Sequence, residues 1–113
     1  MQHFLEQNGY KFWDSKEDWV SKYQIITNKY QKRVDQTDVF VGSLVCLCND
    51  KLFIDIEETF LNDKPSYTIS MTHENGFDEW CDLKIYSLSA RQIQESLLEY
   101  EQKLKKLWDV FCE

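Results

Sequence analysis

The pattern of apolar and polar residues in the first third of the chain has the period of an α-helix. Its large apolar residues follow one another at spacings of four, three and four positions: Trp19, Tyr23, Ile26 and Tyr30. Asp14 or Ser15 precedes this pattern, and either side chain is a favoured N-cap with an acidic residue three positions later. The pattern therefore predicts a helix over residues 15–33, after a short lead-in over residues 1–13.

The middle of the chain has the patterns of β-strands in four segments: 39–48, 52–57, 67–73 and 80–86. The first segment is apolar on both alternating faces, which is typical of a central strand covered on both sides. The second segment alternates between an apolar face and a largely acidic face: Leu52, Ile54 and Ile56 against Phe53, Asp55 and Glu57. The third segment alternates in the same way and predicts a half-exposed strand: Tyr67, Ile69 and Met71 against Thr68, Ser70 and Thr72. Short turn-forming stretches join the segments, so the strands are expected to form antiparallel hairpins.

The last 25 residues predict a long helix with a well-marked start. Ser89 and Gln92 fit a capping box, and Leu88 with Ile93 fits the hydrophobic staple around it. An apolar stripe then continues to the end of the chain: Ile93, Leu97, Tyr100, Leu104, Leu107 and Phe111, widened by Leu98 and Trp108. The predicted fold is a single α+β domain over residues 1–113 with the order αββββα. It has an N-terminal helix, a four-stranded antiparallel meander, and a long C-terminal helix packed on one face of the sheet.

Composition and charge narrow the classes of function. The chain has 113 residues and a net charge of −7, and a pI of about 4.8 argues against non-specific binding to DNA or to anionic membranes. Residues 38–86 hold ten acidic and three basic residues, which alone gives −7. The N-terminus lacks the features of a signal peptide and no segment has the length of a transmembrane helix, so we expect a cytoplasmic protein.

Candidate chemistry is sparse. Cys46 and Cys48 stand two residues apart inside an apolar segment, whereas structural zinc sites use paired turns with two to four residues between the cysteines. We therefore expect Cys46, Cys48 and Cys81 to be reduced, buried thiols, with no metal and no cofactor. None of the common phosphate-loop, zinc-protease or serine-nucleophile motifs occurs, and no basic stripe suits nucleic acid. We expect no catalytic residues and no enzyme activity.

Protein binding remains the best-supported class. The acidic residues of the strands and of the third turn would face a basic partner, and two aromatic residues lie among them: Asp55, Glu57, Glu74, Asp78, Glu79 and Asp82, with Phe77 and Trp80. Aromatic anchors inside an acidic rim are typical of an interface with a positively charged surface. The alternative is that Phe77 and Trp80 only close the core at the end of a hairpin.

The predicted architecture resembles the small immunity proteins of bacterial polymorphic-toxin and contact-dependent growth inhibition systems. The resemblance rests on size, acidic charge, and the order of helix, meander and capped helix ending near Leu107–Asp109. It implies tight binding to one cognate toxin domain, often a nuclease, whose basic active site the inhibitor occludes. Two other functions stay open: a scaffold or assembly subunit, and a phage-type inhibitor of a defence nuclease.

Overall fold

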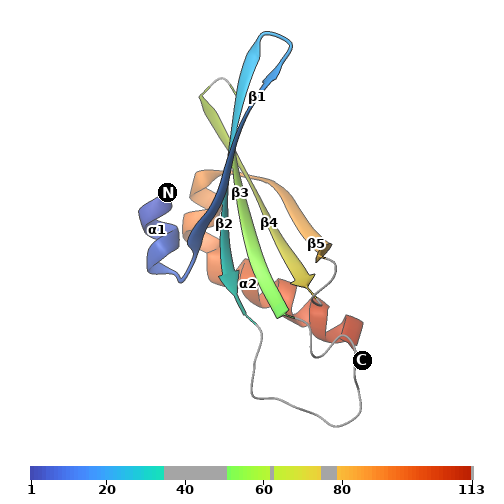
Figure 1. Ribbon diagram of the computed structural model, residues 1–113. Coiled ribbons are helices and arrows are strands. Elements are labelled where there is room, and N and C mark those ends of the chain that lie inside the picture. The colour runs from blue at the N-terminus through green and yellow to red at the C-terminus, as the bar shows by residue number, and fades with distance from the viewer. Residues whose placement is uncertain (35–50, 62, 75–78, 113) are drawn as a thin grey trace.

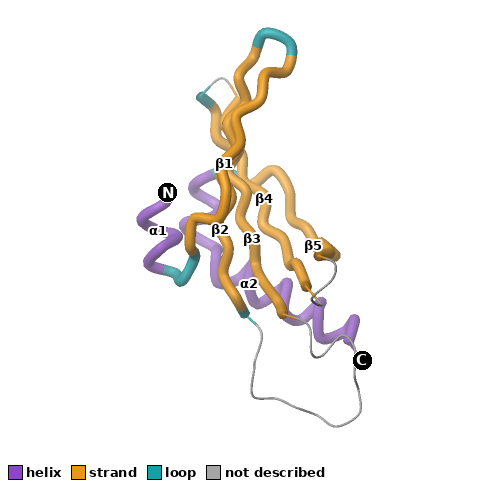
Figure 2. The backbone as a smooth tube through the Cα atoms, viewed as in Figure 1, coloured by secondary structure: helices purple, strands orange, loops and turns teal. Residues whose placement is uncertain are grey.

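The structure is a computed structural model that describes residues 1–34, 51–61, 63–74 and 79–112. Its elements are α1 (Gln2–Gln7), β1 (Lys11–Val20), β2 (Tyr23–Arg33), β3 (Lys51–Leu61), β4 (Lys64–Glu74), β5 (Glu79–Leu88) and α2 (Ala90–Cys112). The five strands form one antiparallel sheet in sequence order, with α2 lying behind it in the view of Figure 1. The predicted α+β class, with an antiparallel meander and a long C-terminal helix on one face, is confirmed (Figure 2). The described sheet has five strands rather than four.

The helix predicted over residues 15–33 is wrong. These residues form most of the β1–β2 hairpin, and the N-terminal helix is α1 instead. Asp14 does not cap a helix; its Oδ1 accepts a hydrogen bond from the backbone N–H of Ser15 at 2.7 Å. The chain reverses at Ser21, which has a φ of 58°, a left-handed conformation that non-glycine residues rarely adopt. Because neither Gly, Asn nor Asp stands at this turn, the usual sequence signal for a hairpin is missing.

Of the four predicted strands, three are strands in the structure and one lies outside the described residues. Segments 52–57, 67–73 and 80–86 lie in β3, β4 and β5, as expected. The segment predicted as a central strand, 39–48, lies outside the described residues. Pro65 belongs to β4, where it lies opposite Phe60 of β3. The pairing of β5 with β4 ends at Tyr67, so Pro65 lies where one side of β4 has no strand beside it in the described sheet, and a missing N–H is tolerated there.

The hydrophobic core lies between the sheet and α2. We call the sheet face that turns toward α2 the inner face and the opposite one the outer face. The fully buried inner-face residues come from the two central strands: Ile54, Ile56, Ile69 and Met71. Ile93, Leu97, Leu104 and Trp108 of α2 are buried in the same cluster. Each such side chain contributes roughly 1.5–3 kcal/mol through its removal from water, so this contact dominates the stability of the fold.

The start of α2 matches its prediction, whereas its apolar stripe needs correction. Ser89 Oγ accepts the N–H of Gln92 at 3.1 Å, and Gln92 Oε1 accepts the N–H of Ser89 at 2.8 Å, which is a complete capping box. Leu98 and Leu107, predicted to face the core, are exposed. Ser96 has a φ of −130° and a ψ of 18°, which interrupts the helix just before Leu98. Leu97, Leu104 and Trp108 beyond Ser96 are nevertheless buried as predicted, so the stripe keeps its phase and is only narrower than expected.

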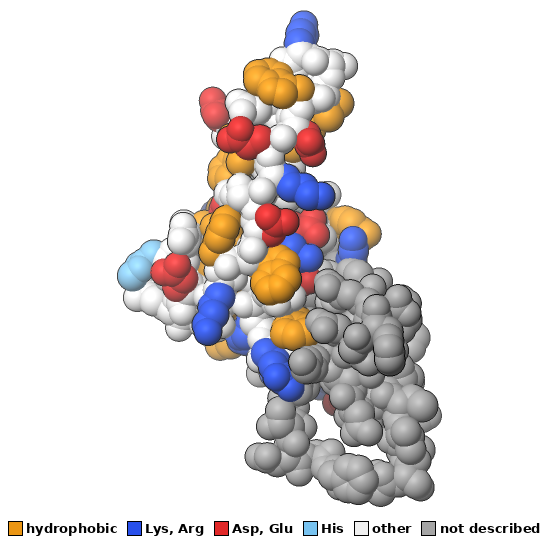
Figure 3. All heavy atoms as spheres, in the orientation of Figure 1, with side chains coloured by type: hydrophobic (Ala, Val, Ile, Leu, Met, Phe, Trp, Pro, Cys, Tyr) orange, Lys and Arg blue, Asp and Glu red, His pale blue; other side chains and the backbone are white. Residues whose placement is uncertain are grey.

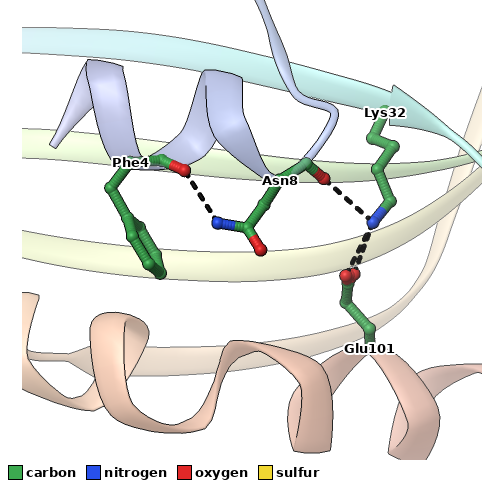
Figure 4. A network of polar contacts seen from close by, with 4 residues as sticks. All are labelled: Phe4, Asn8, Lys32 and Glu101. Carbon is green, nitrogen blue, oxygen red and sulfur yellow. Dashed lines mark hydrogen bonds and ion pairs between the residues drawn. The ribbon is translucent and has the colours of Figure 1, made fainter.

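A buried ion pair joins the two helices to the sheet. Lys32 of β2 lies on the inner face, where its Nζ donates to both carboxylate oxygens of Glu101 at 2.7 and 2.6 Å (Figure 4). The same Nζ donates to the backbone oxygen of Asn8 at 3.2 Å and lies 5.0 Å from the ring centroid of Tyr10. Asn8 in turn donates from its side-chain amide to the carbonyl of Phe4 in α1. One lysine thus connects α1, β2 and α2.

Candidate functional site

Not all of the acidic residues predicted to form an interface are on the surface, because at least one of them is buried and makes contacts within the protein. Asp55 is only 2% exposed, so the expectation that it lies on an open face is wrong, and its role in partner binding stays a prediction. Its Oδ2 accepts a hydrogen bond from Thr72 Oγ1 at 3.0 Å and lies 3.5 Å from Lys29 Nζ. Its Oδ1 is buried and has no hydrogen-bond partner among the residues that the structure describes. Ser70 and Thr72, expected on a half-exposed strand, are also buried on this outer face.

Glu58 is a second acidic residue that the fold uses internally. It lies on the inner face, where its Oε1 accepts from Asn28 at 3.1 Å and its Oε2 accepts from the Tyr67 hydroxyl at 2.7 Å. Burial raises the pKa of the Tyr67 hydroxyl above its ordinary value, and the hydrogen bond to Glu58 and the charge of that carboxylate act in the same direction. Two of the ten acids between residues 38 and 86 therefore stabilise the fold and do not form part of an open acidic surface.

The remaining predicted site residues lie in or between β3, β4 and β5. Glu57 is half-buried on the outer face of β3. The backbones of Glu74 and Glu79 are paired where β4 and β5 meet, and His73 pairs with Trp80. Their side chains, and that of Asp82, are not described, and Phe77 and Asp78 lie outside the described residues. The structure therefore brings the strand-end acids together in backbone register only.

A second surface emerges at the projecting end of the sheet. We call it the distal hairpins: residues 16–27 of the β1–β2 hairpin and residues 59–61 and 63–66 of the β3–β4 hairpin. Its boundary is the row of paired residues Ser15, Asn28, Glu58 and Tyr67, because β5 pairs with β4 no farther than Tyr67. Figure 1 shows both hairpins extending beyond α2. The molecule is accordingly elongated, with principal extents of 53 × 31 × 21 Å.

The distal hairpins carry apolar side chains on both faces. Val20, Tyr23 and Leu61 lie on the outer face with exposures of 55%, 40% and 45%. Trp19 lies on the inner-face side and is 71% exposed. In Figure 3 hydrophobic and charged side chains alternate along this projecting end. A stable sheet normally packs at least one face against other structure, whereas both faces here are open in the described part of the molecule.

Sequence reasoning missed this surface because it assigned Trp19 and Tyr23 to the buried stripe of a helix. A signal for strand was nevertheless present. Ile25, Ile26 and Thr27 are consecutive β-branched residues, which favour a pleated strand over a helix. In β2 these three residues are half-buried, and Ile25 pairs directly with Leu61.

Two kinds of site find no support in the described residues. Across residues 1–34, 51–61, 63–74 and 79–112 there is no cluster of three or more histidine, cysteine, aspartate or glutamate side chains suited to a metal ion. Within the same ranges, no helix combines the length and the apolar character that crossing a bilayer requires. Cys46 and Cys48 lie outside the described residues, and only the backbone of Cys81 is described, so the prediction of buried thiols stays a prediction.

Comparisons with known proteins add no relative. No family model matches the chain, and neither a curated protein nor a solved structure is similar to it.

Proposed function

We propose that this chain is a binding protein that uses its distal hairpins to hold a partner protein, and that the partner is a toxin domain which the bound chain keeps inactive. The observation that carries the proposal is the exposure of Trp19, Val20, Tyr23 and Leu61 on an extension that neither helix covers. The assignment of the partner as a toxin rests on the architectural resemblance to immunity proteins.

The chemistry of the distal hairpins favours a protein partner. Tryptophan and tyrosine are enriched among the residues that dominate binding energy, and truncation of such anchors often costs about 2 kcal/mol or more. The charged residues of this surface balance one another, with three acidic and three basic side chains: Lys16, Glu17, Asp18, Lys22, Asp63 and Lys64. A surface with little net charge and several exposed aromatic groups suits apolar contact with protein rather than contact with nucleic acid.

The shape of the surface supports inhibition by occlusion. A narrow projection with apolar groups on both faces can be surrounded by the walls of a cleft, and clefts are where active sites of enzymes usually lie. A flat or concave surface would offer no such fit. We therefore place the interface on the distal hairpins instead of on an acidic face of the sheet. Glu57 lies at the base of these hairpins.

The first experiment is co-expression with the product of the open reading frame immediately upstream, with host growth as the readout. We expect that product alone to arrest growth and this chain to restore it. The test variant is Trp19→Ala/Tyr23→Ala, which removes two exposed aromatic groups without touching the core. The matched control is Leu98→Ala/Val110→Ala on α2, whose residues are 64% and 69% exposed.

We expect the control pair to rescue growth as the natural sequence does, and the hairpin pair to bind the toxin at least 30-fold more weakly, from about 2 kcal/mol lost. Circular dichroism would verify that both variants are folded. Full rescue and unchanged affinity in the hairpin variant would remove the distal hairpins as the interface. A harmless upstream product, or toxicity that this chain does not relieve, would overturn the toxin assignment.

One observation favours a second candidate, an assembly subunit that associates with itself. In the described sheet β1 is an edge strand, and all ten of its residues are exposed. Three features oppose the pairing of β1 with a strand of a second copy. The register is irregular between Phe12 and Asp14, the backbone N–H of Ser15 already donates to the carboxylate of Asp14, and Lys16 adds a charge to the edge. Light scattering distinguishes the two functions, because a monomer at high concentration rules out the assembly subunit.

A further inference from the structure

A hollow of about 210 Å³ opens on the outer face, at the base of the β1–β2 hairpin. Trp13, Asp14 and Lys16 of β1, Lys29 of β2 and Glu57 of β3 supply its large side chains. In the strand register Asp14 pairs with Lys29, and Lys29 pairs with Glu57. The two carboxylates therefore flank one lysine from neighbouring strands, with their backbones roughly 9–10 Å apart from two strand spacings.

The lysine between them is already balanced by a third acid. Lys29 Nζ lies 3.5 Å from Oδ2 of Asp55, which is almost fully buried on the same face of β3, two residues before Glu57. The ammonium of Lys29 thus pairs with the Asp55 carboxylate, which would be costly to bury without a cation. Among the described residues, neither Asp14 nor Glu57 forms an ion pair. Two carboxylates of the hollow consequently have no cation of their own.

Trp13 supplies an aromatic wall. It lies at the irregularity in the register between Phe12 and Asp14, and bulges of this kind redirect the side chain of the extra residue. Its side chain is 59% exposed while lining the hollow, so a planar group entering there can stack on the indole. A carboxylate on each side and an aromatic face beside them suit a planar cation with several N–H donors.

We propose that this hollow binds the guanidinium of an arginine side chain that the partner protein presents, with Asp14 and Glu57 as acceptors and Trp13 as the stacking wall. This inference rests on the proposed function, because it names the chemistry by which the partner is held at the base of the distal hairpins. A guanidinium fits better than an ammonium, since its fork of donors can serve two carboxylates while its plane stacks on an indole.

The alternative ligand is an anion held by Lys16 and Lys29. It is disfavoured because Lys29 already serves Asp55, and because an anion in the hollow would meet the carboxylates of Asp14 and Glu57. Lys16 is exposed and also lines the hollow, yet it forms no ion pair with either carboxylate in the described part of the chain.

The test is a nuclear magnetic resonance titration of the ¹⁵N-labelled full chain with N-acetyl-arginine-amide. The signal of the Trp13 indole N–H is assigned by its loss in Trp13→Phe. We expect saturable shifts of this indole and of the Ser15 and Lys16 amides, with at least tenfold weaker binding in Asp14→Asn/Glu57→Gln. Asparagine at position 14 keeps an oxygen for the N–H of Ser15, so the strand geometry is retained. Glu99→Gln/Asp109→Asn on α2 removes two exposed charges elsewhere and should bind like the natural chain.

Three results would overturn the proposal: no saturable shift, unchanged binding in Asp14→Asn/Glu57→Gln, or saturable shifts of the same signals with inorganic phosphate. N-acetyl-lysine-amide is expected to bind several-fold more weakly than the arginine derivative, and equal binding would refute the guanidinium preference. Failure of the proposed function can be distinguished from failure of the arginine site. The growth assay depends on the upstream product, whereas the arginine titration uses this chain alone. Arginine binding without rescue would leave the site in place and remove the toxin. Rescue that needs Trp19 and Tyr23, without arginine binding, would remove only the site.

Discussion

Substitution of Lys32 by methionine should test whether the buried ion pair holds the two helices on the sheet. Lys32 Nζ makes hydrogen bonds of 2.7 and 2.6 Å to Glu101 and one of 3.2 Å to the carbonyl of Asn8. Methionine keeps the apolar stem of the side chain and removes all three. Glu101 is only 3% exposed, so its carboxylate would remain inside the protein without a cation.

The expected cost is large because an uncompensated buried charge is left behind. Removal of one partner of a buried pair typically costs about 3–5 kcal/mol. We expect the lower end, near 3 kcal/mol, since the Lys32 side chain is 22% exposed and water can reach part of the site. Domains of this size have total stabilities of roughly 5–15 kcal/mol, so the single substitution would remove a large fraction. At a urea dependence of about 1–3 kcal/mol per molar, the midpoint would fall by roughly 1–3 M.

The assay is urea unfolding followed by far-ultraviolet circular dichroism, with Lys32→Met, Glu101→Leu and the double variant compared in one cycle. The double variant should recover most of the loss, because two apolar groups replace a pair without leaving a charge. Lys103→Met on the exposed side of α2 is the matched control and should leave the midpoint unchanged. A cost below about 1 kcal/mol for Lys32→Met, or a double variant as unstable as the sum of the singles, would refute the reasoning.

Two further predictions concern Gly9, which lies beside Lys32, and Tyr67, which forms a separate hydrogen bond with Glu58. Gly9 has a φ of 91°, and a Cβ there would lie 3.1 Å from Lys32 Cδ. Gly9→Ala should therefore lower the free energy of unfolding by about 1–2 kcal/mol in the same urea assay. An unchanged midpoint would contradict the predicted strain. Tyr67 has a pKa raised above 10 in the folded state, so its contribution to stability is complete below pH 10 and is lost as the pH rises through the folded pKa. Tyr67→Phe should lose about 1–3 kcal/mol at neutral pH, since Glu58 loses a donor, and should lose less additional stability above pH 10. An equal alkaline loss in both proteins would argue against the raised pKa.

The fold class was predictable because most elements carry strong local signals. The alternation of apolar and polar residues correctly predicted β3 and β4. The capping box correctly predicted the start of α2, where Ser89 and Gln92 form reciprocal hydrogen bonds. The width of the buried stripe on α2 was not predictable: Leu97, Leu104 and Trp108 beyond Ser96 are buried as expected, whereas Leu98 and Leu107 are exposed. Periodicity indicates which face of a helix is buried, but not how far the covered stripe extends around the helix.

The error over residues 15–33 has a physical cause in the turn. Trp19 and Ile26 lie on the inner-face side and Tyr23 on the outer face, so residues with helical spacing are distributed over two strands and two faces. Spacing alone does not distinguish these arrangements when the reversal occurs at Ser21, because serine is not one of the residues that favour the positive φ of a tight hairpin turn. The burial of Asp55 was equally hidden, because alternation assigns a residue to a face of the sheet but does not report whether that face is covered.

The distal hairpins are hard to explain by the stability of the isolated chain. Trp19 and Val20 keep more than half of their surface in water, so their burial contributes little to folding. Hairpins without a packed face are marginally stable, and this end of the sheet lies beyond both α2 and the last pairing of β5. Local opening should therefore be easiest here, and backbone amides of residues 16–27 should exchange with solvent faster than those of β3 and β4 beside α2. If a partner binds this surface, its presence should slow exchange at these amides more than anywhere else in the described chain. Protection confined to α2 would instead place the partner on the helix face and leave the exposed aromatic residues of the hairpins unexplained.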